Sequence, residues 1–265
     1  MAMGCRLKLP RQTIEKPDSL PHVIWITSGF MAFMPIHAAR NYAPGTSRKN
    51  RNKIPRENTM SHVISSYFSS INTLAYTRVR KKTVEQRAPN TVLASIINKA
   101  LVIATPQTPK HSEVEWEDLD VQEEIEAVIE SFEDTTVLTW PAQDEVRTGL
   151  KSADLIHFAC HGITDSSDPS NGGLLLCDQQ SNSADILRIR DIVDLKHKHA
   201  QIAFLAACST AEVANLKLAD ESIHLASAFQ LMGFPHVIGT MWRVDDKATG
   251  EVAREFYNQL EGSYS

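Results

Sequence analysis

The feature that most constrains the fold is an unbroken apolar run that ends in a thiol. Residues 202–207 read IAFLAA, and the polarity changes abruptly at Cys208, Ser209 and Thr210. A run of this length without alternation is typical of a strand buried on both faces, as in a parallel sheet covered by helices. We therefore expect Cys208 at the end of a buried strand, where open α/β sheets bind their ligands.

A second stretch has the same construction. Residues 154–162 read DLIHFACHG, so a second apolar run leads into Cys160, His161 and Gly162. If the two strands are neighbours, the imidazole of His161 can take the proton of the Cys208 thiol, and the thiolate is the nucleophilic form of cysteine. The two residues are distant in sequence, so only the fold can bring them together.

Segments with the apolar pattern of strands and segments with the apolar spacing of helices follow one another along the chain. Apolar runs predict strands at residues 23–27, 100–105, 135–140, 174–177 and 236–242, in addition to the two above. Helical spacing predicts helices at residues 64–75, 113–134, 143–151, 186–195, 221–232 and 252–260. The helix at 113–134 is expected to turn an acidic face to solvent. This alternation of strands and helices favours a parallel sheet with helices on both faces.

Length and composition narrow the class of protein. A chain of 265 residues that is 42% hydrophobic can bury a sizeable core, and we expect one α/β domain rather than two small ones. A net charge of −5 gives no reason to expect a nucleic acid or an acidic lipid as partner. The basic stretch at 41–58 lacks interleaved aromatic residues, so we interpret it as a solvated loop, with an acidic partner as the alternative.

The cysteines and the amino terminus bear on the compartment. Four cysteines are too few for a disulfide scaffold and suit a reducing compartment, so we expect a cytoplasmic protein. The first residues lack the apolar core of a signal peptide. The most apolar region, residues 23–39, is interrupted by Pro35 and His37, so we expect a buried strand and a turn there and no membrane span.

Three segments carry a resemblance to a known family. FACHG with His161, LAACSTA with Cys208, and LADESIHLASAFQLMGFPHVIGTMWRVDD at 218–246 resemble the CHAT domain, fungal type, of the caspase-like clan CD cysteine peptidases, which are related to separases. HVIWITSGFMAFMPIHAA and HVISSYFSSINTLAY extend the similarity to residues 20–262, after an amino-terminal extension at 1–19. The resemblance implies a caspase-like three-layer α/β/α sandwich with a mostly parallel central sheet.

The resemblance also implies roles for individual residues. Cys208 occupies the position of the nucleophile and His161 that of the general base, in a Cys-His dyad. Gly162 matches the residue whose backbone N–H forms the oxyanion hole together with that of Cys208. Asp246, with Asp245 beside it, matches the separase carboxylate that selects a basic residue before the cleaved bond, so we expect cleavage after Arg or Lys. No cofactor is required for this chemistry.

Alternative interpretations remain open for each of these residues. Cys208 can be a small buried hydrophobic residue at a strand end. Cys160, His161, Cys208 and Cys177 could be imagined as a zinc site, although neighbouring Cys160 and His161 should point to opposite faces of a strand, so we expect no metal. Asp246 is also a natural amino-terminal cap for the closing helix.

The expected partners follow from the resemblance. A cysteine endopeptidase implies a protein or peptide substrate. CHAT domains often follow tetratricopeptide or similar repeats, so the resemblance implies repeats of this kind as partners, with the chain as one domain of a longer product or as a short paralogue. The main alternative function is a caspase-like interaction or scaffold module that performs no catalysis.

Overall fold

The computed structural model describes the chain in separate stretches. They are residues 20–27, 31, 34–40, 58–87, 93–108, 116–163, 165, 168–178, 183–195, 197, 199–206, 221–240 and 244–262. Spatial contacts divide the chain into two compact units, Met1–Trp25 with Pro35–Tyr67, and Ile26–Met34 with Phe68–Ser265. The expected extension at 1–19 and most of the basic stretch at 41–58 lie outside the described residues.

The first unit holds most of a two-stranded sheet, formed by β1 (His22–Ile26) and β2 (Ile64–Phe68). The strand predicted at 23–27 is confirmed by β1. The helix predicted to begin at residue 64 is wrong, because residues 64–68 pair with β1 instead. Helix α1 (Ile71–Arg87) begins after Ser70, whose Oγ accepts the Thr73 N–H at 3.1 Å as a cap.

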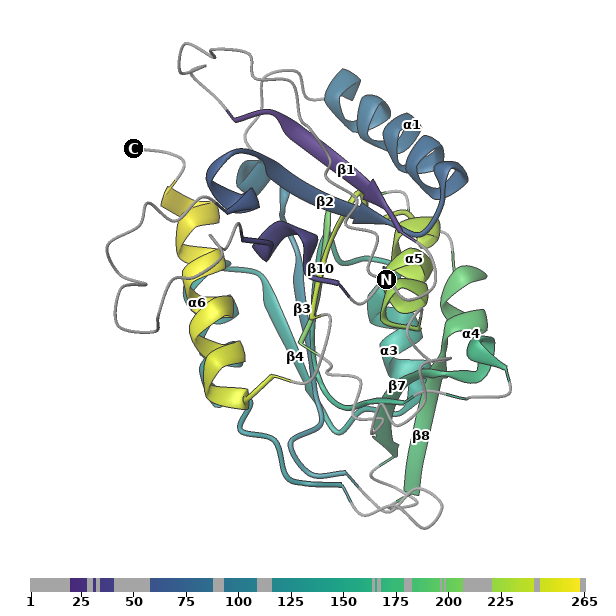
Figure 1. Ribbon diagram of the computed structural model, residues 1–265. Coiled ribbons are helices and arrows are strands. Elements are labelled where there is room, and N and C mark those ends of the chain that lie inside the picture. The colour runs from purple at the N-terminus through teal and green to yellow at the C-terminus, as the bar shows by residue number, and fades with distance from the viewer. Residues whose placement is uncertain are drawn as a thin grey trace, which may run out of the picture. The chain divides into compact units, whose positions relative to one another are not determined.

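The second unit is built on a five-stranded sheet (Figure 1). Its strands are β3 (Ala100–Ala104), β4 (Thr135–Thr139), β5 (Leu155–Ala159), β9 (Ile202–Leu205) and β10 (His236–Gly239). Their order across the sheet is β10-β9-β5-β3-β4, and each neighbouring pair is parallel. The expected α/β class with a mostly parallel central sheet is therefore confirmed.

Helices cover both faces of this sheet (Figure 1). On one face lie α3 (Gln143–Leu150), α4 (Ile189–Val193) and α5 (Glu221–Met232), and on the other α2 (Gln122–Ser131) and α6 (Asp246–Gly262). In β5, Ile156 and Phe158 pack in the cluster on the α3/α4/α5 side, whereas Leu155 packs on the α2/α6 side. Burial of such side chains contributes about 1.5–3 kcal/mol each, which explains why these strands lack polar alternation.

A smaller antiparallel sheet follows β5. It contains β6 (Gly162–Ile163), β7 (Gly173–Asp178) and β8 (Ser183–Arg188), in that order. The helix predicted at 186–195 is therefore wrong at its start, because residues up to Arg188 pair with β7, and only Ile189–Val193 are helical. This sheet begins directly after His161.

The chain turns into β10 at a glycine. Gly233 follows α5 with φ of 135°, a backbone conformation that residues with a Cβ rarely adopt. The helix predicted at 221–232 is confirmed by α5, and the closing helix at 252–260 lies inside α6. Over the described stretches, no helix combines the length and the apolar character that a membrane crossing requires.

Candidate active site

His161 lies two residues beyond the end of β5, at the carboxyl edge of the parallel sheet. Its backbone is fixed by the smaller sheet, because the Leu175 N–H donates to the His161 carbonyl at 2.8 Å. Side chains along β5 point alternately to the two faces of the sheet. His161 is an even number of residues from Leu155 and His157, so it is expected on the same face as they are. Its ring accordingly contacts residues that immediately precede α2, on the α2/α6 side of the sheet.

The ring of His161 is held by residues 116–121, which we call the 116–121 segment. The Nε2 of His161 lies 2.8 Å from the Glu117 carbonyl oxygen, so this nitrogen carries a proton and donates it. The Trp116 ring lies against the imidazole, with 4.9 Å between ring centroids. His161 is only 3% exposed. These contacts fix both the orientation and the tautomer of the imidazole.

Gly162 is buried and opens β6. It lies opposite Leu174 of β7 in the antiparallel pairing. A backbone that is paired in a sheet next to His161 keeps a constant orientation, which a preorganised N–H donor requires.

Cys208 lies outside the described residues. The last described residue before it is Ala206, whose N–H donates to the Phe158 carbonyl at 2.9 Å. The strand predicted in the apolar run 202–207 is present as β9 (Ile202–Leu205), which is the direct neighbour of β5. The strands that lead to His161 and to Cys208 are therefore adjacent and parallel.

Cys160 has a different environment from His161, as the alternation predicts. It packs in the cluster on the α3/α4/α5 side and is 1% exposed. Burial raises the pKa of the Cys160 thiol far above its ordinary value, with the negative charge of Glu124 adding to the effect. A thiol that stays protonated is a poor nucleophile. In the described part of the chain, no three His, Cys, Asp or Glu side chains are grouped as a metal ion would need.

Asp245 and Asp246 lie at the start of α6. The Oδ1 of exposed Asp245 accepts the Lys247 N–H at 3.1 Å, so Asp245 caps the helix, and not Asp246 as in the alternative interpretation. The Oδ2 of Asp246 instead accepts the Asp120 N–H at 3.1 Å. Asp246 is thereby tied to the same 116–121 segment that contacts His161.

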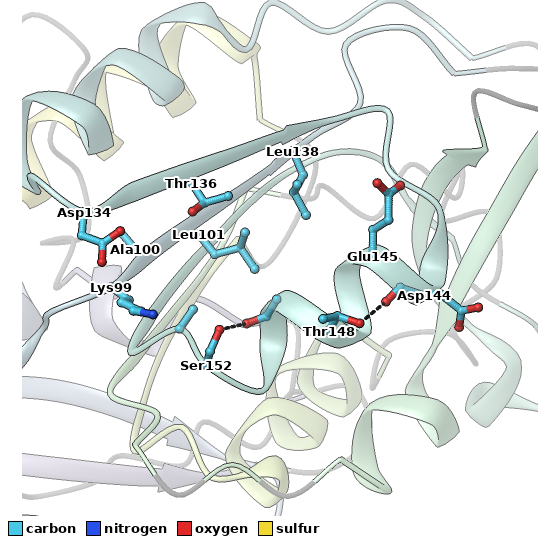
Figure 2. A pocket seen from close by; sticks show the side chains of 12 residues that line it. Lys99, Ala100, Leu101, Asp134, Thr136, Leu138, Asp144, Glu145, Thr148 and Ser152 are labelled. Atoms are coloured by element: carbon cyan, nitrogen blue, oxygen red, sulfur yellow. Dashed lines mark hydrogen bonds between the residues drawn. The ribbon is translucent and has the colours of Figure 1, made fainter.

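A pocket elsewhere in the second unit contains none of the predicted site residues. It has a volume of about 550 Å³ and lies between edge strand β4 and α3, with Leu101, Thr136 and Leu138 on its sheet side (Figure 2). Lys99 and Asp134 line it near the amino ends of β3 and β4. It therefore opens at a different part of the sheet from His161.

Trp116 and Glu117 are the site residues that sequence reasoning missed. The stretch 113–134 was expected to be a single helix, whereas α2 begins only at Gln122. The contribution of Glu117 is a backbone carbonyl, which leaves no signal in residue types. Trp116, an aromatic residue in a stretch with eleven acidic ones, was an indication that this part of the stretch contacts the rest of the protein.

Comparison with known protein families gives one match. The sequence model of the CHAT domain family matches residues 6–264. A search of curated proteins finds no match. CHAT domains are a caspase-like cysteine peptidase family, and the mostly parallel five-stranded sheet flanked by helices is consistent with a caspase-like sandwich. Because the match covers nearly the whole sequence, the chain belongs to the CHAT domain family.

Proposed function

We propose that this protein is a cysteine endopeptidase in which Cys208 is the nucleophile and His161 the general base and acid. The family is one of caspase-like cysteine peptidases. The observation that carries the proposal is the bond between His161 Nε2 and the Glu117 carbonyl. A neutral imidazole that donates from Nε2 has its lone pair on Nδ1, which is the form a general base needs.

Register supports Cys208 as the thiol that reaches this nitrogen. In β9, Ile202 and Phe204 pack on the α2/α6 side of the sheet. Continued alternation predicts the same side for Cys208, which is also the side of His161. Ala206 is bonded to β5, and two further residues span at most about 7.6 Å between Cα atoms. Cys160, the neighbour of His161 in sequence, packs on the opposite face.

The proposed reaction is an acyl transfer. The Cys208 thiol gives its proton to His161 Nδ1, and the thiolate attacks the carbonyl carbon of the substrate peptide. The N–H groups of Gly162 and Cys208 bind the resulting oxyanion, where one such donor contributes about 2.7–4 kcal/mol. His161 then protonates the leaving amine, and water hydrolyses the thioester, which restores the thiol.

We further propose a preference for Arg or Lys before the cleaved bond. Asp245 and Asp246 form a pair of carboxylates at the start of α6, and Asp246 is linked to the segment that contacts His161. A carboxylate at the rim of the cleft would hold Arg by two parallel hydrogen bonds and Lys by one.

Covalent labelling tests the proposal. The full chain is incubated under reducing conditions with peptide acyloxymethyl ketones that differ only in the reacting residue, Arg or Leu. Mass mapping then identifies the modified residue. We expect labelling at Cys208, faster with the Arg reagent, and little labelling in the His161→Gln variant.

Two cysteine variants serve as controls. Cys208→Ala should abolish labelling, whereas Cys160→Ala should keep it, because the Cys160 thiol is buried and protonated. A folded wild type that shows no labelling would favour a non-catalytic interaction module. Faster labelling by the Leu reagent would refute the basic preference and leave the dyad intact.

A further inference from the structure

The 116–121 segment touches both His161 and Asp246. At one end the Trp116 ring and the Glu117 carbonyl contact the imidazole. Three residues later, the Asp120 N–H donates to Asp246 Oδ2 at 3.1 Å. A single short stretch of backbone thus connects the proposed general base with the start of α6.

Further attachments of the segment lie on its apolar side. The Leu119 N–H donates to the Pro106 carbonyl at 2.8 Å, and the Leu119 side chain packs on Ala104 and Ala159. The side chains of Glu117 and Asp120 are exposed. The Asp246 carboxylate, at the start of α6, accepts a backbone N–H near the other end of the segment, so α6 supplies a polar attachment of the segment.

We infer that Asp246 is a positioning residue, which holds the 116–121 segment so that the Glu117 carbonyl keeps His161 in its Nε2–H tautomer. This inference rests on the proposed function. If the segment shifts, the carbonyl moves away from Nε2, and the imidazole can rotate or carry its proton on Nδ1. An imidazole protonated on Nδ1 cannot accept the proton of a thiol there.

The positioning role and the specificity role make different predictions for one substitution. Holding the segment needs only an oxygen that accepts the Asp120 N–H, and an asparagine side chain has one. Binding a basic substrate residue needs the negative charge. Asp246→Asn should therefore preserve positioning while it weakens any preference for Arg, and Asp246→Ala should lose both.

Two measurements on the full chain read the state of the dyad without a peptide substrate. The first is the rate of Cys208 alkylation by iodoacetamide at pH 7, resolved by mass mapping, because only the thiolate reacts. The second is the ¹⁵N NMR spectrum of labelled histidine, with the His161 signals assigned by their loss in His161→Gln. The nitrogen shifts report which ring nitrogen carries the proton.

We expect Asp246→Ala to slow alkylation by about 10-fold, since small displacements of catalytic groups have effects of this order or larger. The His161 spectrum should change from Nε2–H to a mixture of tautomers. Asp246→Asn should restore most of both signals. The control Glu251→Ala removes an exposed carboxylate from the same helix without touching the segment, and it should match the wild type.

The outcomes separate the two proposals. A wild-type rate equal to that of His161→Gln refutes the proposed dyad, whereas the tautomer of His161 still reports on Asp246. An unchanged His161 tautomer in Asp246→Ala refutes the positioning role. Equal defects in Asp246→Asn and Asp246→Ala also refute it, because the charge and not the acceptor would then matter. If Asp246→Ala fails to fold, Asp246→Asn provides the test instead, because a change of the His161 tautomer in Asp246→Asn refutes the inference.

Discussion

His157 and His161 are buried to a similar degree and face the same side of the sheet, but their ring nitrogens have different partners. His157 Nε2 lies 2.6 Å from Glu124 Oε2, and its Nδ1 lies 2.9 Å from the Tyr257 hydroxyl. Its ring also stacks on Phe204. Side chains of two helices therefore satisfy both nitrogens of His157, which makes it a structural residue that joins β5 to α2 and α6.

Replacement of Tyr257 by phenylalanine should show this structural role. Burial raises the pKa of Tyr257 well above its ordinary value, with the charge of Glu124 adding to the effect, so the hydroxyl keeps its proton and donates to His157. Tyr257→Phe leaves the Nδ1 of His157 buried without a partner, and we expect a loss of about 1–3 kcal/mol in the free energy of unfolding, measured with urea. Tyr76→Phe, at an exposed tyrosine of α1, should change nothing. Equal stability of Tyr257→Phe and wild type would show that the bond contributes nothing.

At this scale, residue types predicted some of the contacts and not others. His157 stands within an apolar run, a place that predicts an inward side chain, and the side chain is buried. Its partner was not predicted, since Glu124 belongs to a stretch whose carboxylates were all assigned to an acidic outer face. Glu124 is 4% exposed, and only the pairing of a helix with a distant strand reveals why a carboxylate is buried there.

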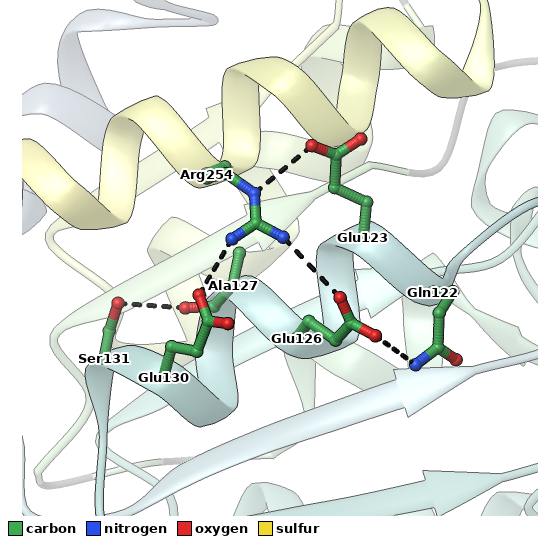
Figure 3. Close-up of polar contacts among 7 residues, drawn as sticks. All are labelled: Gln122, Glu123, Glu126, Ala127, Glu130, Ser131 and Arg254. Atoms are coloured by element: carbon green, nitrogen blue, oxygen red, sulfur yellow. Dashed lines mark hydrogen bonds and ion pairs between the residues drawn. The ribbon is translucent and has the colours of Figure 1, made fainter.

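Arg254 of α6 forms ion pairs with α2, the helix against which α6 packs (Figure 3). The guanidinium of Arg254 contacts three glutamates of α2, with nitrogen–oxygen distances of 3.2 Å to Glu123, 3.7 Å to Glu126 and 2.8 Å to Glu130. The hydrogen bond to Glu123 is the main cause that raises the pKa of Arg254. The acidic face predicted for α2 is thus partly neutralised by the neighbouring helix.

Arg254→Ala should lower the midpoint of thermal unfolding, because it leaves three like charges of α2 without their counter-ion. The decrease should be modest, since these side chains are partly solvated, and it should shrink at high salt, which screens exposed pairs. The unfolding midpoint of Arg254→Lys should lie between those of the wild type and Arg254→Ala, because an ammonium cannot reach three carboxylates in the same geometry. A salt-independent decrease would point to lost packing of the arginine stem instead.

Two elements show why periodicity alone was insufficient. Ile64, Tyr67 and Phe68 have helical spacing, but they lie in a short apolar run, where the strand and helix interpretations are hard to separate. The Ser69–Ser70 pair was the better signal, since Ser70 caps α1. The start of the helix predicted at 186–195 failed because residues up to Arg188 pair with β7 in an antiparallel hairpin, and this pairing overrides the helical spacing.

On the scale of the whole molecule, the strands of the central sheet and its parallel class could be predicted from the sequence. Apolar runs without alternation require cover on both faces, and that requirement implies the layered arrangement. The order β10-β9-β5-β3-β4 could not be predicted, because neighbouring runs in sequence do not have to be neighbours in a sheet. That order makes the strands that precede His161 and Cys208 adjacent.

Two histidines at the amino ends of the sheet strands link the stability of the whole fold to pH. Burial lowers the pKa of His236 from 6.5 to about 4, with the positive charge of Lys81 adding to the effect. Burial also lowers the pKa of His197, whose Nδ1 accepts the N–H groups of His199 and Ala200. Both rings are therefore neutral in the folded state over a range in which the unfolded chain is protonated.

The sign of the pH effect follows from proton binding. Between pH 6.5 and about 4 the unfolded state binds a proton at His236 that the folded state does not, so acidification favours unfolding. The contribution of His236 is fully present above pH 6.5 and is lost as the pH falls through this window. At 1.36 kcal/mol per pKa unit, the loss between pH 7.5 and 4.5 should be about 2–3 kcal/mol.

Urea unfolding of the wild type and of His236→Asn at both pH values isolates this contribution, because the carboxylates that also titrate are common to the two proteins. The variant has no ionisable group at this position, so its free energy of unfolding should fall by about 2–3 kcal/mol less than that of the wild type on acidification. His62→Asn, at an exposed histidine, should follow the wild type. Parallel pH dependence of wild type and His236→Asn would mean that the ring at position 236 accepts a proton in the folded state as readily as in the unfolded one.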